Sequence, residues 1–158
     1  MLDPKNFQRL ESASNSHVGS DFEGVAKELL DSYGLRLEKD FSLPVGVCSK
    51  SKEHRFDLGS LEPKVIVECK SHRWTTGNNV PSAKMTVWNE AMYYFFLAPE
   101  DYRKILFVLR DYSYKKGETL AAYYWRTYGH LVPQGVEIWE YDEETRKAIV
   151  WEETAEDR

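Results

Sequence analysis

Hydrophobic positions in the first part of the chain follow a helical period and then change to an extended pattern. Over residues 20–34, apolar side chains recur at intervals of three and four and stop at Gly34, which predicts a helix. The apolar residues on this repeat are Phe22, Val25, Ala26, Leu29 and Leu30. Residues 35–47 then have extended character, interrupted by Pro44 and Gly46, and a loop rich in lysine and serine follows them.

Two strands are expected after this loop, over residues 55–61 and 64–70, joined by Glu62 and Pro63. The second strand has the sequence KVIVECK, and its run of β-branched residues is typical of a buried central strand.

The second half of the chain predicts two more helices and three more strands. We expect helices over 81–98 and 118–128, a buried strand over 105–109, and two strands around an acidic turn at 142–145. Strands and helices in this order predict an α/β fold, with a central mixed β-sheet flanked by helices.

The length of 158 residues fits one domain, and we expect residues 1–158 to form it. Residues 1–19 are polar and rich in serine near their end, which indicates a loose N-terminal arm. Residues 137–158, the expected C-terminal hairpin, carry nine acidic and three basic residues, so the net charge of −5 is concentrated there. The remaining chain has 17 acids and 18 bases, so net charge neither supports nor opposes DNA binding.

Other features of the sequence bear on where the protein works. No apolar run approaches the roughly 18 residues that cross a bilayer, and the N-terminal sequence lacks the pattern of a signal peptide. Two cysteines, Cys48 and Cys69, are too few for the disulfide framework of a small secreted protein. We therefore expect a cytoplasmic protein that does not bind membranes.

One stretch carries chemistry: HRFDLGSLEPKVIVECK, with Asp57, Glu68 and Lys70. Glu68 and Lys70 lie two apart on a predicted strand and should share a face, with Cys69 on the opposite face. An antiparallel pairing through the short turn can bring Asp57 beside Glu68. Two carboxylates and an ammonium group are the groups that magnesium-assisted phosphodiester hydrolysis requires.

With Asp57 followed at a distance by Glu68-Cys69-Lys70, the chain resembles the PD-(D/E)XK nuclease superfamily. The flanking helix, strands, helix and strand strengthen the likeness, which covers residues 19–110, whereas 111–158 cannot be placed. One departure is Phe56, which stands where the family motif has proline.

The resemblance implies a restriction-endonuclease-like sheet and a Mg²⁺ cofactor, with Mn²⁺ as a substitute. It implies that Asp57 and Glu68 bind the metal, together with the backbone carbonyl of Cys69, and that Lys70 is the catalytic lysine. Many members place a glutamate of the first helix near the metal, and Glu23 is the matching residue. Cutting both strands usually takes two active sites, so a homodimer is a further expectation.

Some of these residues have other interpretations. Glu23 lies three residues after Ser20, which is the spacing of a capping box, so helix capping explains it nearly as well. Glu68 and Lys70 could form a surface ion pair, although a central strand is a poor place for one. Zinc binding by the cysteines and nearby histidines matches no familiar spacing.

Basic residues on both sides of the motif are the expected DNA contacts, and a solvated basic rim is the alternative. They are Lys50, Lys52, Arg55, His72, Arg73 and Lys84. A second basic and aromatic patch, with a weaker claim, comprises Tyr112, Tyr114, Lys115 and Lys116.

The sequence thus predicts a Mg²⁺-dependent DNA endonuclease of the restriction, junction-resolving, homing or repair type. The alternative is a non-catalytic DNA-binding or assembly module on the same fold, and RNA stays open as a substrate. The intact trio Asp57, Glu68 and Lys70 favours the enzyme, because a lapsed site is free to lose such residues.

Overall fold

The computed structural model describes residues 21–151, which form a six-stranded mixed sheet with helices on both faces and a separate two-stranded sheet. The described part of the N-terminal helix covers residues 21–32. The elements that follow it are β1 (Glu38–Val45), β2 (Lys52–Leu61), β3 (Lys64–Lys70), α2 (Ser82–Leu97), β4 (Arg103–Leu109), β5 (Tyr112–Ser113), β6 (Glu118–Thr119), α3 (Leu120–Tyr128), the short 3₁₀ helix η1 (Gly129–Leu131), β7 (Val136–Asp142) and β8 (Lys147–Trp151).

The main sheet has six strands in the order β1-β2-β3-β4-β7-β8. Strands β1, β2 and β3 form an antiparallel meander, β3, β4 and β7 run parallel, and β8 returns antiparallel to β7. Parallel neighbours need crossover connections, which α2 and α3 provide. The predicted α/β class, a central mixed sheet flanked by helices, is therefore confirmed.

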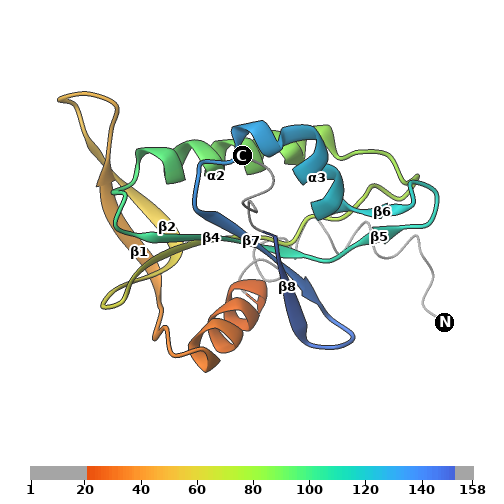
Figure 1. Ribbon diagram of the computed structural model, residues 1–158, viewed down its shortest axis with the longest axis horizontal. Coiled ribbons are helices and arrows are strands. Elements are labelled where there is room, and N and C mark those ends of the chain that lie inside the picture. The colour runs from red at the N-terminus through yellow and green to blue at the C-terminus, as the bar shows by residue number, and fades with distance from the viewer. Residues whose placement is uncertain (1–20, 152–158) are drawn as a thin grey trace.

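Two hydrophobic cores lie on the two faces of this sheet. Helices α2 and α3 cover one face, and the N-terminal helix covers the other (Figure 1). Strand β3 contributes to both cores, since Val65, Ile66 and Val67 are all at most 1% exposed. This double burial explains the β-branched run that marks the strand in the sequence.

Several boundaries differ from the sequence predictions. Strand β2 begins at Lys52, three residues early, because Val45 and Lys52 already pair at the end of the β1–β2 hairpin. Helix α3 begins at Leu120 and not at Glu118, because Glu118 and Thr119 form β6. The β5–β6 hairpin was not predicted.

Two further groups of expectations concern the ends of the chain and membrane-spanning helices. The expected arm 1–19, the Ser20 cap and residues 152–158 lie outside the described residues. Within residues 21–151, no helix is both long and apolar enough to cross a membrane.

The face of the sheet on which the buried side chains of β2 lie changes at Asp57. Phe56 packs in the core beneath α2, whereas Leu58 packs in the opposite core. Side chains two apart on a regular strand point to the same face, so the strand is distorted between them. The neighbouring strand is distorted beside it, at Asp40, whose φ is +55°. This distortion positions the candidate site.

Candidate active site

An opening between β2 and β3 brings the predicted residues together. Backbone pairing of these strands ends at Leu58 and Val67, although the next facing pair would be Asp57 and Glu68. The Asp57 carboxylate instead accepts a hydrogen bond from the Cys69 backbone N–H, at 2.7 Å. The side chain of Asp57 thus takes the place of a backbone partner and is held in the opening.

Glu68 and Lys70 share a face of β3, as the sequence predicts. Lys70 Nζ lies 3.3 Å from Glu68 Oε2, and the Glu68 side chain is only 9% exposed. Cys69, between them, packs against the opposite core. Burial raises the pKa of the Cys69 thiol well above its ordinary value, which fits a packing role for this side chain.

His54 is a further member of the site. Its Nε2 lies 3.4 Å from Glu68 Oε1. The His54 ring stacks on Tyr94 of α2, with centroids 3.6 Å apart, and meets Phe56 edge-on. Tyr94 was not predicted as a member of the site, because the run AMYYFFLA does not reveal which tyrosine faces the sheet.

Glu23 reaches the same cluster from the N-terminal helix. Burial is the largest influence on the pKa of Glu23 and raises it. The charge of Lys39 lowers it, the charges of Asp40 and Glu68 raise it, and a hydrogen bond with Asp57 lowers it. Asp57 responds in the same way: burial and then the charge of Glu68 raise its pKa to about 7. Asp57 and Glu23 therefore both lie close enough to Glu68 for its charge to disfavour their ionisation.

The cluster has the donors of a sparse metal site. Among residues 21–151, no group of three or more His, Cys, Asp and Glu side chains is arranged so that it could hold a metal ion. Mg²⁺ does not require such a group, because it is commonly held by one or two carboxylates, waters and substrate phosphates. Asp57, whose pKa is about 7 beside the Glu68 carboxylate, fits such an ion, since the charge of the ion would favour the ionised form of Asp57.

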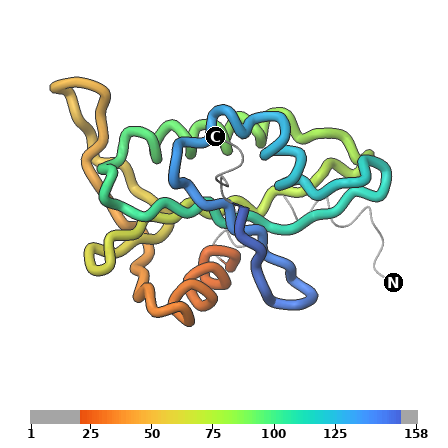
Figure 2. The backbone as a smooth tube through the Cα atoms, viewed as in Figure 1, coloured from red at the N-terminus to blue at the C-terminus, as the bar shows by residue number. Residues whose placement is uncertain are grey.

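The predicted DNA contacts on the N-terminal side of the motif lie on the β1–β2 hairpin. Lys50 and Lys52 are exposed near its tip, which projects beyond the sheet at one end of the molecule (Figure 2). Arg55 is also exposed and faces Asp40 across the hairpin, with Nε and Oδ1 3.6 Å apart. All three can approach a phosphate backbone.

The predicted contacts after the motif have more partners. Arg73 forms ion pairs with Glu143, at 2.9 Å, and with Asp111, at 3.9 Å. His72 accepts a hydrogen bond from Trp88 Nε1 at its Nδ1, 2.8 Å away. Burial and the nearby charge of Lys84 lower the pKa of His72 to about 4. His72 is therefore neutral at pH 7 and can donate a hydrogen bond but offers no positive charge.

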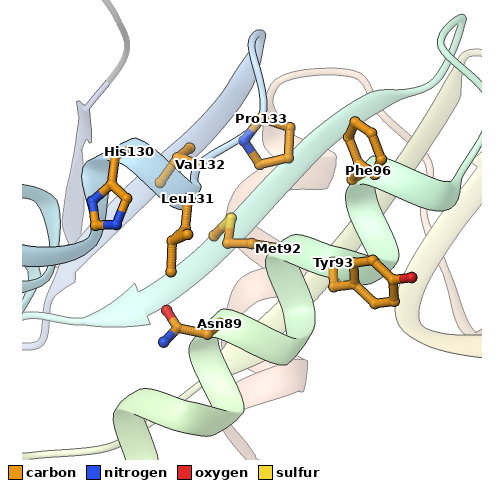
Figure 3. A pocket seen from close by; sticks show the side chains of 8 residues that line it. All are labelled: Asn89, Met92, Tyr93, Phe96, His130, Leu131, Val132 and Pro133. Carbon is orange, nitrogen blue, oxygen red and sulfur yellow. The ribbon is translucent and has the colours of Figure 1, made fainter.

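A surface hollow lies away from the carboxylates. It has a volume of about 340 Å³ between α2 and the segment around η1 (Figure 3). None of the residues that line it belongs to the cluster of Asp57, Glu68 and Lys70: they are Asn89, Met92, Tyr93, Phe96, His130, Leu131, Val132 and Pro133. The lining contains no carboxylate and no lysine or arginine, so it offers nothing for metal-assisted hydrolysis.

Comparison with known proteins adds no relative. No protein-family model, no curated protein and no solved structure matches this chain.

Proposed function

We propose that this chain is a Mg²⁺-dependent DNA endonuclease with a restriction-endonuclease-like fold. One observation carries the proposal: Asp57, Glu68 and Lys70 converge where β2 and β3 separate. The order of elements also supports it, since a helix precedes three antiparallel strands, and α2 then leads to β4 parallel to β3.

A purely structural role explains this cluster poorly. An exposed ion pair contributes only about 0–1 kcal/mol, and a buried one is often no more stable than an apolar replacement. Here Glu68 is buried, and two further carboxyl groups, Asp57 and Glu23, share its surroundings. Such crowding costs stability, and catalytic sites are where costs of this kind are commonly found.

In this proposal each residue has a defined part. Asp57 and Glu68 hold Mg²⁺, or Mn²⁺ in its place, together with the Cys69 carbonyl, and Glu23 supports them. When bound, the cation activates a water and neutralises charge that develops on the phosphate. Lys70 positions the attacking water or takes its proton, and stabilises the transition-state charge. His54, clamped by Tyr94, orients the Glu68 carboxylate.

The first experiment is plasmid cleavage with Mg²⁺, Mn²⁺ or EDTA by the wild type, Asp57→Asn and Lys70→Ala. Lys64→Ala is the matched control, since Lys64 lies on the same strand at its other end, paired with Asp101. We expect metal-dependent cutting by the wild type and Lys64→Ala, reduced at least a hundredfold in the other two. Equal cutting by all four proteins would refute the assignment.

The same assay also tests whether two copies of the chain act together, and whether the chain is instead a non-catalytic DNA-binding module. We propose that two copies act together on duplex DNA, so linear plasmid should form without a long nicked phase. DNA binding with no cleavage of plasmid, branched DNA or RNA would favour the non-catalytic module.

A further inference from the structure

The β5–β6 hairpin stands at the same edge of the sheet as the proposed catalytic residues. Strands β3 and β4 are parallel and adjacent, with Lys70 beside Val108, so β4 ends at the edge where Lys70 lies. The hairpin begins three residues after the end of β4 and extends from the sheet at the end opposite the β1–β2 hairpin (Figure 1). In open α/β sheets, ligands bind outside the carboxyl ends of the strands.

The hairpin is fastened to the loop that follows Lys70. The backbone N–H and the indole N–H of Trp74 both donate to Asp111, at 2.8 and 2.9 Å. Ser113 Oγ donates to Asn78 Oδ1, at 3.0 Å. These bonds hold the base of the hairpin in a set position relative to the catalytic strand.

The tip itself is tightly built. The N–H of Gly117, whose φ is +72°, donates to the Ser113 carbonyl at 2.7 Å. The N–H of Lys116 donates to Ser113 Oγ, which belongs to a fully buried serine. A side chain on this tip therefore needs little further ordering of the backbone to bind a partner.

The tip presents an aromatic ring and two lysines to solvent. Tyr114 is 93% exposed and meets Tyr112 edge-on, with centroids 5.0 Å apart, while Arg110 lies over the Tyr112 ring. Lys115 and Lys116 are exposed, and no carboxylate of the described residues lies within ion-pair distance of either. Apart from the contact between Tyr114 and Tyr112, no described ring contact or ion pair involves these three side chains.

We propose that the β5–β6 hairpin is a second DNA-contacting element. It binds the substrate beside the cleavage centre and binds an unpaired strand in preference to a duplex. Lys115 and Lys116 contact phosphates, whose charge complements theirs. Tyr114 stacks on a base outside the duplex stack, because a ring that is 93% exposed at the tip of a hairpin is accessible to an unpaired base. The inference rests on the proposed function and specifies the substrate as DNA that joins duplex to single strand.

The test is fluorescence anisotropy in EDTA, which prevents cleavage, with a short duplex and the same duplex carrying a single-stranded tail. We expect Tyr114→Ala to weaken binding of the tailed DNA roughly tenfold and to leave the plain duplex nearly unchanged. The double variant Lys115→Ala/Lys116→Ala should weaken both and lower the slope of log Kd against log salt by about 1.8.

Matched controls remove the same groups elsewhere. Tyr33→Ala removes an exposed tyrosine on the other face of the sheet, and Lys27→Ala/Lys64→Ala removes two positive charges far from the hairpin. If the hairpin variants bound both DNAs as tightly as these control variants do, the inference would be overturned. Metal-dependent plasmid cleavage by the wild type would in that case still support the proposed function. Failure of the wild type to bind either DNA would also overturn it. Loss of cleavage alone, with binding as expected, would overturn only the proposed function.

Discussion

Asp57 replaces a backbone partner with a side chain. Its carboxylate bonds to the Cys69 N–H where a pair with Glu68 would otherwise continue the sheet. This arrangement satisfies the backbone donor of the strand, yet it places an acid beside Glu68 in a half-buried opening. Asp57, to which we assign the binding of a metal, thus also brings into the fold a charge that its surroundings disfavour.

The consequence is a pH-dependent stability of the metal-free protein. The pKa of Asp57 rises from 3.8 in the unfolded chain to about 7 in the fold, so the native state binds more protons between these values. Stability from this group is therefore full below about pH 4 and is lost as the pH rises through 7. Asp57→Asn keeps an acceptor for Cys69 but has no charge.

We expect Asp57→Asn to be more stable than the wild type by roughly 2–4 kcal/mol at pH 8 in EDTA, with the difference shrinking toward pH 4. Urea denaturation at the two pH values measures this. A variant that is less stable at pH 8 would mean that the Asp57 charge supports the fold.

His72 gives the opposite dependence on pH. Its folded pKa of about 4 lies below the ordinary value of 6.5, because burial and nearby lysines disfavour the charged ring. The stability that it contributes is present above pH 6.5 and is lost as the pH falls through 4.

We expect His72→Asn, which retains an acceptor for Trp88 Nε1, to lose less stability than the wild type between pH 6.5 and 4. Thermal melts followed by tryptophan fluorescence compare the two proteins. An NMR titration of the His72 ring with a midpoint near 6.5 would contradict the neutral assignment.

The sequence predicted some of these residues and could not predict others. Glu68 and Lys70 share a face because strand geometry demands it, and the short turn aligns Asp57 with them. The clamp of His54 by Tyr94 depends on how α2 lies over the sheet. Such tertiary contacts leave no periodic trace in the chain.

Elements are joined by a buried polar contact at the start of α3. The side chain of Thr119 accepts the Ala122 N–H as the helix cap, and its hydroxyl donates to Glu140 Oε2 on β7, at 2.7 Å. Glu140 is 2% exposed, and burial raises its pKa despite this bond. One hydroxyl therefore caps a helix and satisfies a buried carboxyl group.

We expect Thr119→Val to lower the free energy of unfolding by roughly 2–4 kcal/mol, since it removes a cap and the donor to a buried acceptor. Thr119→Ser keeps both bonds and should lose less than about 1 kcal/mol. Urea denaturation of the two variants measures the difference, and equal losses would show that the two hydrogen bonds contribute no more than the methyl group that serine lacks.

At this scale, prediction succeeded where patterns were long. Helix α2 was expected over 81–98 and runs over Ser82–Leu97, and its buried stripe of Met85, Trp88, Met92 and Phe95 follows the helical period. The β5–β6 hairpin was missed because two-residue strands contain no period to detect. It is held by hydrogen bonds to the loop that follows Lys70, which is far away in the sequence.

The whole molecule places two projecting hairpins around one candidate centre. The β1–β2 hairpin carries Lys50 and Lys52, the β5–β6 hairpin carries Lys115 and Lys116, and the sheet lies between them (Figure 1). This spacing of positive charge arises only in the folded chain. The net charge of −5 conceals it, because the excess of acidic over basic residues lies near the C-terminus.

The meander β1–β2–β3 also has a consequence for the order in which the chain assembles. Its strands are neighbours both along the chain and in the sheet, whereas β4 and β7 join through crossovers that close long loops. Local pairings form faster than distant ones. In refolding followed by pulsed hydrogen exchange, amides of β2 and β3 should gain protection before those of β7, and the reverse order would contradict this. Asp57 and Glu68 would then meet early, before the part of the sheet that contains β4 and β7 has formed.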